Sequence, residues 1–423
     1  MAEQHGKTLV PQIRFAGFTD PWEQRKLGEL FEESDERASD REILSVSVAN
    51  GIYPASESDR ETNPGASLAN YKVVHSGDVV YNSMRMWQGA VDASRYDGIV
   101  SPAYVVAKPN SEVYARFFAR LLRQPMLLKQ YQQVSQGNSK DTQVLKFDDF
   151  ASIEISMPAS ENEQRQIGAF FDRLDSLITL HQRKYDKLCV LKKSMLDKMF
   201  PKGGSLYPEI RFAGFTDPWE QRKLGELTEI KDSARIPNRL WREAGVPYIR
   251  ASDISQEDLR GALFIDEEDY AAYKAATGAP EKGDVLFNGG GEIGKAIING
   301  NSSPIYVQGG AVLYARIAHS SLLDARYLVA AFVTQNVVNA IGVLSAGGTM
   351  KHFTLQPAKN LPIEVPSIAE QRRIGAFFDR LDSLITLHQR KYCGVASWML
   401  GVALVRLGSE SDGAFGEMKH VLR

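Results

Sequence analysis

The clearest hydrophobic pattern in the chain predicts one long amphipathic helix near its middle. Apolar and aromatic side chains recur four and three residues apart, as in a coiled-coil heptad, at Ile167, Phe171, Leu174, Ile178, His181, Tyr185 and Leu188. Met195 and Met199 continue this stripe after an interruption at Lys192, and the run Pro201–Ser205 ends the helix. At about 1.5 Å per residue the stripe is roughly 50 Å long. It needs a partner, because an unpaired helix would leave it in water.

Repetition in the sequence supplies that partner. Residues Glu163–Tyr185 return as Glu370–Tyr392, with Gln166 against Arg373 as the single difference. The stripe therefore recurs at Ile374, Phe378, Leu381 and Ile385. We expect the two copies to pair as antiparallel coiled-coil helices, since each would otherwise expose an apolar face.

A second duplicate marks the start of two modules. The segment Ile13–Leu30 returns without one difference as Ile210–Leu227. The stretches that follow, Phe31–Asn162 and Thr228–Ala369, are about equally long but mostly dissimilar. A chain that keeps its connecting segments the same and varies its modules is expected to recognise two different things within one frame.

The dissimilar modules nevertheless share an order of elements. Each has a turn followed by a strand, then an apolar strand, a helix and a loop of small residues. These are Gly77–Asn82, Ala103–Ala107, a helix from Ala115 and Ser135–Lys140 in the first module, and Gly283–Asn288, Ala311–Ile317, a helix from Ala325 and Ser345–Lys351 in the second. This order predicts an α+β fold with two similar mixed modules, without the regular alternation of a doubly wound sheet.

Composition and charge narrow the function only slightly. The chain is 43% hydrophobic and 24% charged, as in ordinary globular proteins. It has no leader pattern and no apolar run of about 18 residues, so a cytoplasmic location is the default expectation. The net charge of −2 conceals uneven stretches: residues 163–202 hold nine Lys or Arg against five Asp or Glu, and residues 31–61 hold three against nine. Local basic surfaces decide DNA binding, so the net charge neither predicts nor excludes it.

The sequence contains no familiar catalytic or metal-binding motif. Cys189 and Cys393 lack the spacing of a zinc site, and the seven histidines are scattered. The chain contains no Asn-Pro-Pro-aromatic motif of amino-methyl transfer, no G-x-S-x-G and no H-E-x-x-H. His181 and His388 occupy matched stripe positions, for which packing is a better explanation than catalysis. We therefore predict a chain without catalytic or metal-binding residues.

One glycine-rich run formally resembles a phosphate-binding loop. Gly289–Lys295 satisfies G-x-G-x-x-G and nearly fits G-x-x-x-x-G-K-[ST]. Both motifs need a helix to follow, whose N-terminus holds the phosphate. The residues that follow, Ala296–Gly300, instead predict a strand entering a hairpin, and Ala296 lacks the hydroxyl that magnesium requires. We expect a tight loop between strands, whose Lys295 approaches a DNA backbone closely because glycines add no bulk.

Candidate DNA contacts gather in the first module at Tyr81–Gly89. Asn and Gln side chains pair with adenine edges and Arg with guanine, which makes Asn82, Arg85 and Gln88 candidates. Trp87 is expected to pack in the core. Corresponding positions and small-residue loops complete the set of candidates: Ser139, Lys140, Asn288, Lys295, Lys351 and His352.

A short helix carries three arginines on one side. Arg116, Arg120 and Arg123 lie four and three residues apart, with apolar side chains on the opposite side. The pattern is typical of a solvated outer face. The alternative is phosphate contact, for which Arg116 and Arg120 are the candidates.

These features together resemble the specificity subunit of Type I restriction–modification enzymes, over nearly all of the chain up to Tyr392. The resemblance is carried by Phe15–Gly28 with its repeat Phe212–Gly225, by Glu163–Asp175 with its repeat Glu370–Asp382, and by Gly77–Gly89, which is similar to one variety of target-recognition domain.

The resemblance implies two target-recognition domains, at residues 1–162 and 203–369, and two spacer helices, at 163–202 and 370–392, followed by an atypical tail at 393–423. Each domain would read half of an asymmetric double-stranded DNA site, and the helices would fix the gap. The helices would also dock methyltransferase subunits, two in number, through the stripe residues Ile167, Phe171, Leu174, Ile178, Ile374, Phe378, Leu381 and Ile385. S-adenosylmethionine, ATP and magnesium are expected on the partner subunits, which flip and methylate the base and recruit the restriction subunits.

The sequence after Tyr392 departs from the repeat. Leu188–Phe200 continues the first copy with heptads, whereas Cys393–Leu407 contains two glycines and no heptad. We expect this change to shorten the second helix and to leave the distal half of the first helix without a partner. An alternative hypothesis is a silent variant that donates recognition cassettes by recombination, and a remoter one is a nucleotide-dependent enzyme built on Gly289–Lys295.

Overall fold

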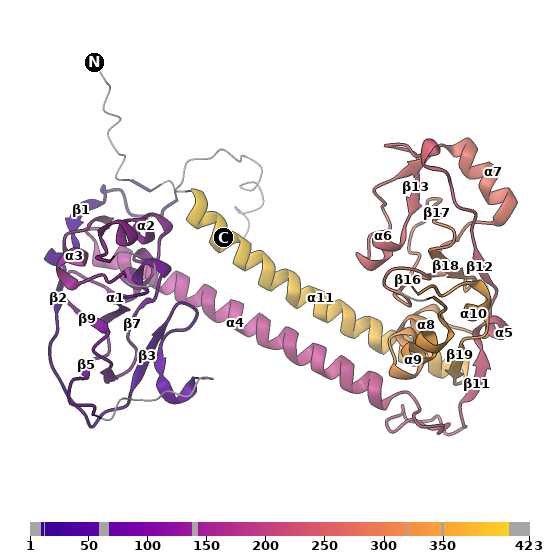
Figure 1. Cartoon of the computed structure of the whole chain (residues 1–423), viewed down its shortest axis with the longest axis horizontal. Helices are drawn as coiled ribbons and strands as arrows, with labels where there is room; N and C mark the ends of the chain where they lie inside the picture. Colours follow the sequence, from indigo (N-terminus) through magenta and orange to yellow (C-terminus); the bar gives the residue numbers. More distant parts are fainter. Residues whose placement is uncertain are drawn as a thin grey trace, which may run out of the picture. The chain divides into compact units, whose positions relative to one another are not determined.

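The computed structural model describes residues 10–11, 13–58, 67–137, 143–318, 320–347 and 351–405. The chain divides into two compact units (Figure 1). Unit 1 comprises Met1–Leu180 and Tyr392–Arg423, and unit 2 comprises His181–Lys391. Each unit contains one module together with parts of two long helices.

Unit 1 alternates short strands with short helices before the first long helix begins. Its elements are β1 (Glu23–Lys26), η1 (Leu27–Glu29), β2 (Phe31–Glu33), β3 (Leu44–Ser47), β4 (Gly51–Pro54), η2 (Ala55–Glu57), β5 (Lys72–Val74), β6 (Val79–Asn82), η3 (Met86–Gln88), β7 (Val91–Ala93), β8 (Gly98–Val100), β9 (Tyr104–Pro109), α1 (Ala115–Leu121), α2 (Pro125–Val134), α3 (Phe147–Ala151), β10 (Glu154–Met157) and the first part of α4 (Glu161–Lys198).

The centre of unit 1 is a four-stranded antiparallel sheet in the order β2-β9-β6-β7. Val79 and Tyr81 of β6 belong to one hydrophobic cluster, and Val80 between them belongs to another. This alternation follows from the two-residue period of a strand. The first cluster also contains Phe150 of α3, whose ring centroid lies 5.1 Å from that of Tyr81. The sheet is therefore buried on both faces at β6.

Unit 2 begins and ends with a similar order of elements and differs from unit 1 in the middle of its module. It comprises the second part of α4 and then β11 (Glu220–Lys223), α5 (Leu224–Leu227), β12 (Ile230–Asp232), η4 (Asn238–Leu240), β13 (Val246–Ile249), α6 (Ala251–Ser255), β14 (Phe264–Ile265), α7 (Glu267–Thr277), β15 (Val285–Asn288), β16 (Ala296–Ile298), β17 (Tyr306–Val307), β18 (Val312–Ala315), α8 (Ala325–Phe332), α9 (Gln335–Leu344), α10 (Leu355–Lys359), β19 (Pro362–Val365) and the first part of α11 (Ile368–Val405).

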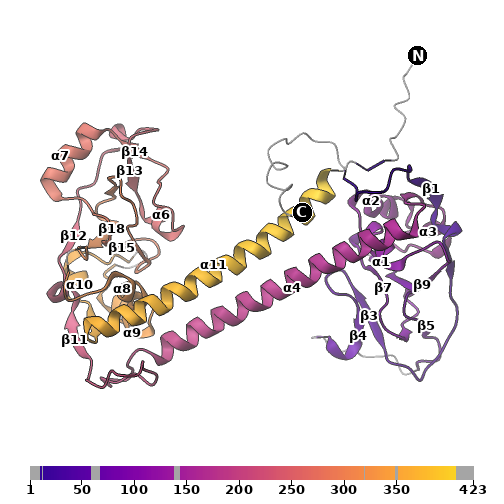
Figure 2. The same cartoon turned by 180° about the vertical axis from the view of Figure 1, so that it is seen from behind.

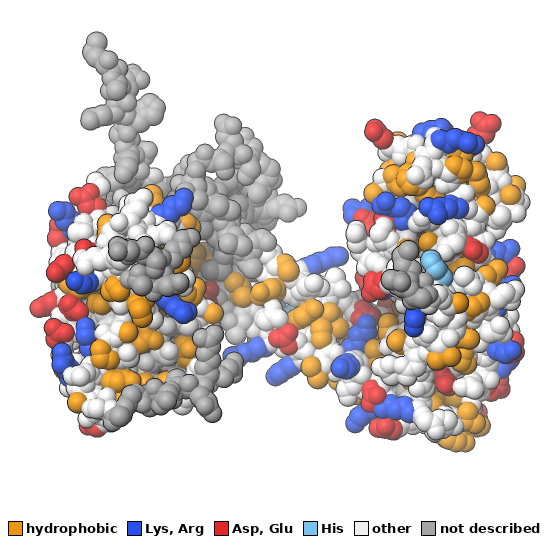
Figure 3. Space-filling model, in the orientation of Figure 1, with side chains coloured by type: hydrophobic (Ala, Val, Ile, Leu, Met, Phe, Trp, Pro, Cys, Tyr) orange, Lys and Arg blue, Asp and Glu red, His pale blue; other side chains and the backbone are white. Residues whose placement is uncertain are grey.

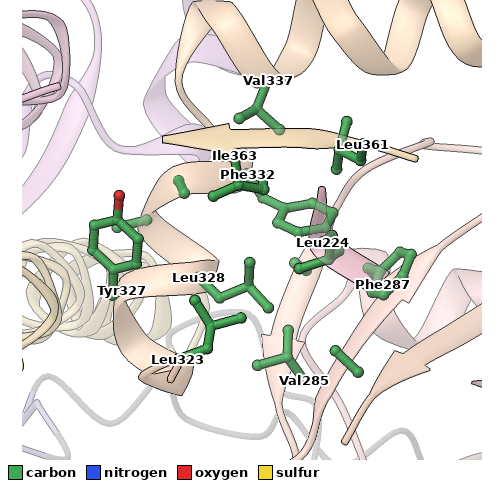
Figure 4. Close-up of a cluster of buried hydrophobic side chains, with 14 of the residues drawn as sticks. Leu224, Val285, Phe287, Leu323, Tyr327, Leu328, Phe332, Val337, Leu361 and Ile363 are labelled. Atoms are coloured by element: carbon green, nitrogen blue, oxygen red, sulfur yellow. The ribbon is translucent and has the colours of Figure 1, made fainter. Parts of the chain in front are cut away.

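The main sheet of unit 2 has the order β12-β18-β15-β16, which matches β2-β9-β6-β7 strand for strand. Val285 and Phe287 of β15 pack against Leu328 and Phe332 of α8 (Figure 4). Leu286, pointing to the other face, lies in a separate cluster. The predicted α+β fold with two similar modules is confirmed.

The two kinds of duplicated segment meet within each unit. In unit 1, Arg14 forms two hydrogen bonds of 2.6 and 2.7 Å with the carboxylate of Glu163. In unit 2, Arg211 does the same with Glu370 at 2.7 and 2.8 Å. Both glutamate side chains are 1% exposed. Such bidentate pairs are strong and geometrically specific, so the repeated sequences close each unit in the same way.

A duplicated glutamine then fixes the variable part of each module. The Oε1 of Gln164 accepts from the backbone N–H of Tyr114, at 2.9 Å, just before α1. The Oε1 of Gln371 accepts from that of Asp324, at 3.1 Å, just before α8. The Nε2 of the same glutamine donates to the backbone carbonyl two residues before that N–H, at 3.0 Å in both units: Glu112 in unit 1 and Leu322 in unit 2. The repeated helices thus hold two different sequences through backbone atoms, which do not depend on side-chain identity.

Within unit 2, α4 and α11 run side by side (Figures 1 and 2). Lys192 Nζ of α4 lies 2.5 Å from Asp382 Oδ1 of α11. His181, which comes earlier in α4, contacts His388, which comes later in α11. Residue numbers in the two helices therefore increase in opposite directions, which confirms antiparallel pairing. Stripe residues Ile374 and Phe378 are only 1% and 2% exposed, so the predicted stripe is a packing seam.

The long helices differ from the expected ones at their ends. α11 continues past Tyr392 to Val405, and α4 ends at Lys198. The predicted shortening after Tyr392 is therefore wrong up to Val405, because Gly394 and Gly401 each weaken a helix by only about 1 kcal/mol. The distal half of α4 is also partnered, since antiparallel pairing sets it against the start of α11.

No single helix in the described part of the chain is long and apolar enough to cross a membrane, although α8 and α9, which meet at a 73° bend, are so when taken together.

Candidate nucleic-acid interface

In unit 1, the turn after β6 lies beside the loop after α2. The backbone N–H of Leu145 donates to the carbonyl of Ser83 at 2.9 Å. Gln136 and Val144 exchange two backbone hydrogen bonds, of 3.0 and 2.8 Å, at the neck of the loop. The described residues of these two segments, 82–89, 135–137 and 143–145, are called loop site 1.

Loop site 1 presents a small set of polar side chains from a rigid base. Arg85 and Gln88 are exposed. Asn82 is half-buried, and its Oδ1 accepts from the backbone N–H of Met84 at 3.0 Å, which shapes the turn. Trp87 packs against the core cluster and donates its Nε1–H to the Met84 carbonyl, so its predicted packing role is confirmed. Arg85 and Gln88 are therefore held on a turn whose neighbours are fixed.

Two predicted residues, Ser139 and Lys140, lie outside the described residues.

Unit 2 repeats the arrangement with different side chains. The backbone N–H of Phe353 donates to the carbonyl of Gly289 at 2.8 Å, as Leu145 does to Ser83. Ala346 and His352 exchange two backbone hydrogen bonds, of 3.1 and 2.8 Å, at the neck of the second loop. The described residues of these two segments, 288–295, 345–347 and 351–353, are called loop site 2. The structure thus brings Lys295, Lys351 and His352 into one loop cluster, and the last two are exposed.

The glycine run of loop site 2 connects two antiparallel strands. Phe287 of β15 pairs with Ala296 of β16, and Asn288 exchanges backbone hydrogen bonds of 2.9 Å with Gly294 and Lys295. The residues after Lys295 form the strand β16 and not the helix that a phosphate-binding loop requires. The prediction of a loop between strands is confirmed.

Asn288 differs from its expected role as an exposed contact. Its side chain is fully buried, and its Nδ2 donates to the carbonyl of Ala251 at 3.0 Å and to Ser255 Oγ at 3.2 Å. It therefore anchors α6 to the start of the glycine loop. A side chain buried in this way positions the loop and presents no polar atom to a duplex.

Lys295 is engaged by a residue that the sequence did not single out. Its Nζ lies 2.7 Å from Oε1 of Glu257, which follows α6 and has φ of +56°. A left-handed backbone is usual for glycine or asparagine after a helix, so no sequence pattern pointed to a glutamate here.

Arg116 and Arg120 lie against α4. Arg116 forms a bidentate pair with Asp172, at 2.6 and 3.0 Å, and Arg120 bonds to Asp172 and Asp175. The two arginine side chains are only 16% and 22% exposed. The prediction of a solvated outer face is therefore wrong. The sequence pattern did not reveal this, because the carboxylates that pair with the arginines come from a distant segment. Burial raises the pKa of Asp172, but the hydrogen bonds and charges of both arginines outweigh burial and leave that pKa lowered.

The stripe residues expected to dock a partner are used inside the chain. Ile374, Phe378 and Leu381 belong to the core of unit 2, and Ile385 is half-buried. In unit 1 their duplicates are all half-buried: Ile167, Phe171, Leu174 and Ile178. In unit 2 the core of the module and the end of α4 therefore cover most of the stripe, and docking of a partner through it stays a prediction.

Another set of duplicated leucines is exposed. In unit 2, Leu384 and Leu387 of α11 are 37% and 44% exposed, and in unit 1 their duplicates Leu177 and Leu180 of α4 are 38% and 45% exposed. These positions could not be predicted from the heptad pattern, because that pattern marks only the side of the helix that pairs.

Charge on the surface of unit 2 is mixed in sign. On the face in view in Figure 3, groups of Lys and Arg side chains lie among scattered Asp and Glu side chains. Such local basic groups are sufficient to contact phosphates even when the whole chain has a net charge of −2.

A family model and several relatives match this chain. The model described as Type I restriction modification DNA specificity domain matches residues 19–189 and 216–395. The Type I restriction enzyme MjaVIII specificity subunit of Methanocaldococcus jannaschii is 22% identical over 258 residues, which cover 57% of this chain and 58% of that protein. A putative type I restriction enzyme specificity subunit of Haemophilus influenzae, S.HindORF215P, is 24% identical over 164 residues, covering 38% and 40%. The chain therefore matches less than two thirds of the length of these relatives.

The fold also has a counterpart among solved structures. The Type-I restriction-modification system S subunit from M. genitalium superposes with a TM-score of 0.55 at 14% identity, covering 93% of this chain and 98% of that one. At this identity the similarity shows a shared fold.

Proposed function

We propose that this chain, which belongs to the family of Type I restriction modification DNA specificity domains and carries two of them, reads a two-part DNA site, one part with each module. It is a specificity subunit. In this proposal it holds no catalytic residue of its own and acts within a complex whose partner subunits methylate and cleave.

The observation that carries this proposal is the pair of matched loop sites. Both sit at the ends of equivalent strands, β6 and β15, of sheets with the same order. Both are fastened by the same backbone hydrogen bond, Leu145 to Ser83 and Phe353 to Gly289. The side chains they present differ, and base sequence is read by side chains at base edges. Equal scaffolds with unequal loops therefore favour two unlike half-sites.

The repeated helices suit the role of a spacer with docking positions. One continuous helix, α4, belongs partly to each unit, and the length of the connection between recognition elements limits the spacing of half-sites. We propose that methyltransferase subunits dock on the exposed leucines rather than on the buried stripe. S-adenosylmethionine, ATP and magnesium would be bound by those partners.

The test is co-expression with the methyltransferase subunit, followed by sequencing of methylated sites. The parent chain should give a split motif. Exchanging residues 31–160 for those of another specificity subunit should change one half of the motif, and exchanging residues 228–366 should change the other half. If either exchange altered both halves together, the assignment of one half-site to each module would be wrong.

A second candidate, an inactive variant, rests on the change of sequence after Tyr392. In unit 2, Met199 and Phe200 at the end of the first copy complete the core around Phe378. The second copy carries no equivalent of this Met-Phe pair. Failure of the chain to co-purify with the methyltransferase subunit would favour the inactive variant, and co-purification would favour the active subunit.

A further inference from the structure

A third segment joins the two loops of loop site 2. Asn288 ties the glycine loop to α6 through Ala251 and Ser255. Immediately after α6, Glu257 turns the chain, and its N–H donates to the carbonyl of Ile254 at 3.0 Å. The carboxylate of Glu257 is thereby brought to Lys295, at the end of the glycine loop.

The conformation of Glu257 is unusual for its residue type. Among the non-glycine residues in the described ranges, it is the one with positive φ, at +56°. This region is unfavourable for a side chain with a Cβ, and glycine or asparagine fits better after a helix. The local fold alone therefore gives no reason for a glutamate.

The ion pair between Glu257 and Lys295 also gives little structural reason for a glutamate at this position. The Glu257 side chain is 66% exposed, and Lys295 is 29% exposed. An ion pair this open to water stabilises a fold very little. The carboxylate therefore remains available to a ligand that enters the loop cluster.

Charge restricts what this carboxylate can contact on DNA. Phosphates repel it, whereas base edges in the major groove offer two amino donors, N4 of cytosine and N6 of adenine. Lys295 beside it offsets the charge and holds the carboxylate in place, and it also supplies a cation to the backbone.

From this arrangement we infer that Glu257 is a specificity-determining residue of the second module, which accepts a hydrogen bond from a base amino group while Lys295 positions it. The inference rests on the proposed function and adds to it a named residue and a chemical class of base edge. Lys295 then acts as a positioning residue through the 2.7 Å contact.

The experiment compares Glu257→Gln and Glu257→Gly with the parent in the full complex with its methyltransferase subunit. Discrimination at one base pair of the second half-site should fall roughly 5- to 150-fold, the range for one good base contact. The first half-site should not change. Glu257→Gly removes the unfavourable conformation, so its melting temperature should equal or exceed that of the parent, which excludes misfolding as the cause.

Glu229→Gln is the matched control, because Glu229 is 61% exposed and pairs with Lys231 at 3.2 Å away from the loop site. It should leave the motif unchanged. The inference is overturned if both Glu257 variants methylate the parent motif with parent discrimination. That result would leave the proposed function intact, since the module exchanges test it separately.

Discussion

The Nδ1 atoms of His181 and His388 lie 2.9 Å apart, although 207 positions separate these residues along the chain. They are the same residue of the duplicated segment, one on α4 and one on α11. The contact therefore marks the point within unit 2 where the two copies cross. It needs one ring to donate and the other to accept, so a single proton lies between the two atoms.

This contact predicts that the helix pairing of unit 2 weakens in mild acid. Burial, then the charges of His388, Lys391 and Lys184, lower the pKa of His181 below its usual 6.5. The unfolded chain then binds more protons than the folded one, so stability is present above about pH 6.5 and is lost as pH falls below it. Hydrogen exchange of α11 at about pH 5.5 and 7.5 measures this effect.

Two variants separate the histidine contact from general acid effects. His181→Gln keeps a hydrogen-bonding side chain that does not titrate, so it should flatten the pH dependence of exchange in α11. His352→Gln, at an exposed position of loop site 2, should keep it. Equal pH dependence in the parent and His181→Gln would contradict the assignment.

A second prediction uses one aspartate that occurs in two environments. Asp172 accepts hydrogen bonds from Arg116 and Arg120, and its pKa is lowered as a result. Its duplicate Asp379 is exposed, and no ion pair to it is found among the described residues. Asp172→Asn should destabilise unit 1 by about 1–3 kcal/mol, since it leaves partly buried arginines without their anion. Asp379→Asn should change stability by less than about 0.5 kcal/mol.

Urea denaturation measures the change in the free energy of unfolding, and hydrogen exchange in α1 and α8 shows which unit is affected. The sequence around the two aspartates is identical, so any difference arises from the module that packs against them. Similar losses in both variants would mean that the aspartate acts within its own helix.

A third prediction concerns docking of the methyltransferase subunit. Leu384→Ser with Leu387→Ser removes two exposed leucines, so the melting temperature should hold, while affinity for the methyltransferase subunit should fall at least about tenfold. Phe378→Ala is the contrasting variant, because it empties a buried core position and should destabilise the fold by about 3–5 kcal/mol. Pull-down and calorimetry measure both quantities. Unchanged affinity in the double variant would exclude these leucines as a docking site.

Local patterns in the sequence predicted the frame, and contacts between distant segments decided the rest. The heptad stripe and the strand after Lys295 depend on neighbouring residues, so both were predictable. The environment of Arg116 depends on Asp172, 56 positions away, and no periodicity reveals that pairing. The role of Glu257 depends on a backbone angle that is unusual for glutamate, and burial of Asn288 depends on α6. The candidate site was therefore predictable as a set of loops, and the roles of its side chains were not.

The end of the first duplicate leads to a last prediction. Phe200 stacks on Tyr327 with ring centroids 5.6 Å apart and lies 6.2 Å from Phe378. With Met199 it covers the seam where α8 meets α11, and Phe378 is 2% exposed as a result. In unit 1 the identical residue Phe171 remains half-buried, and the sequence after Tyr392 supplies no matching Met-Phe pair.

Replacing the residues after Tyr392 with the sequence Asp186–Ser205 should therefore bury Phe171 and stabilise unit 1. Covering one phenylalanine and adding a Met-Phe pair removes apolar surface from water, so a gain of about 2–4 kcal/mol is expected. The melting temperature and the amount of methyltransferase subunit that co-purifies should both increase. The same replacement with Met and Phe changed to Ser keeps helix length and charge, so it isolates the packing of those two side chains. If both replacements raise the melting temperature equally, helix length rather than a filled seam is responsible.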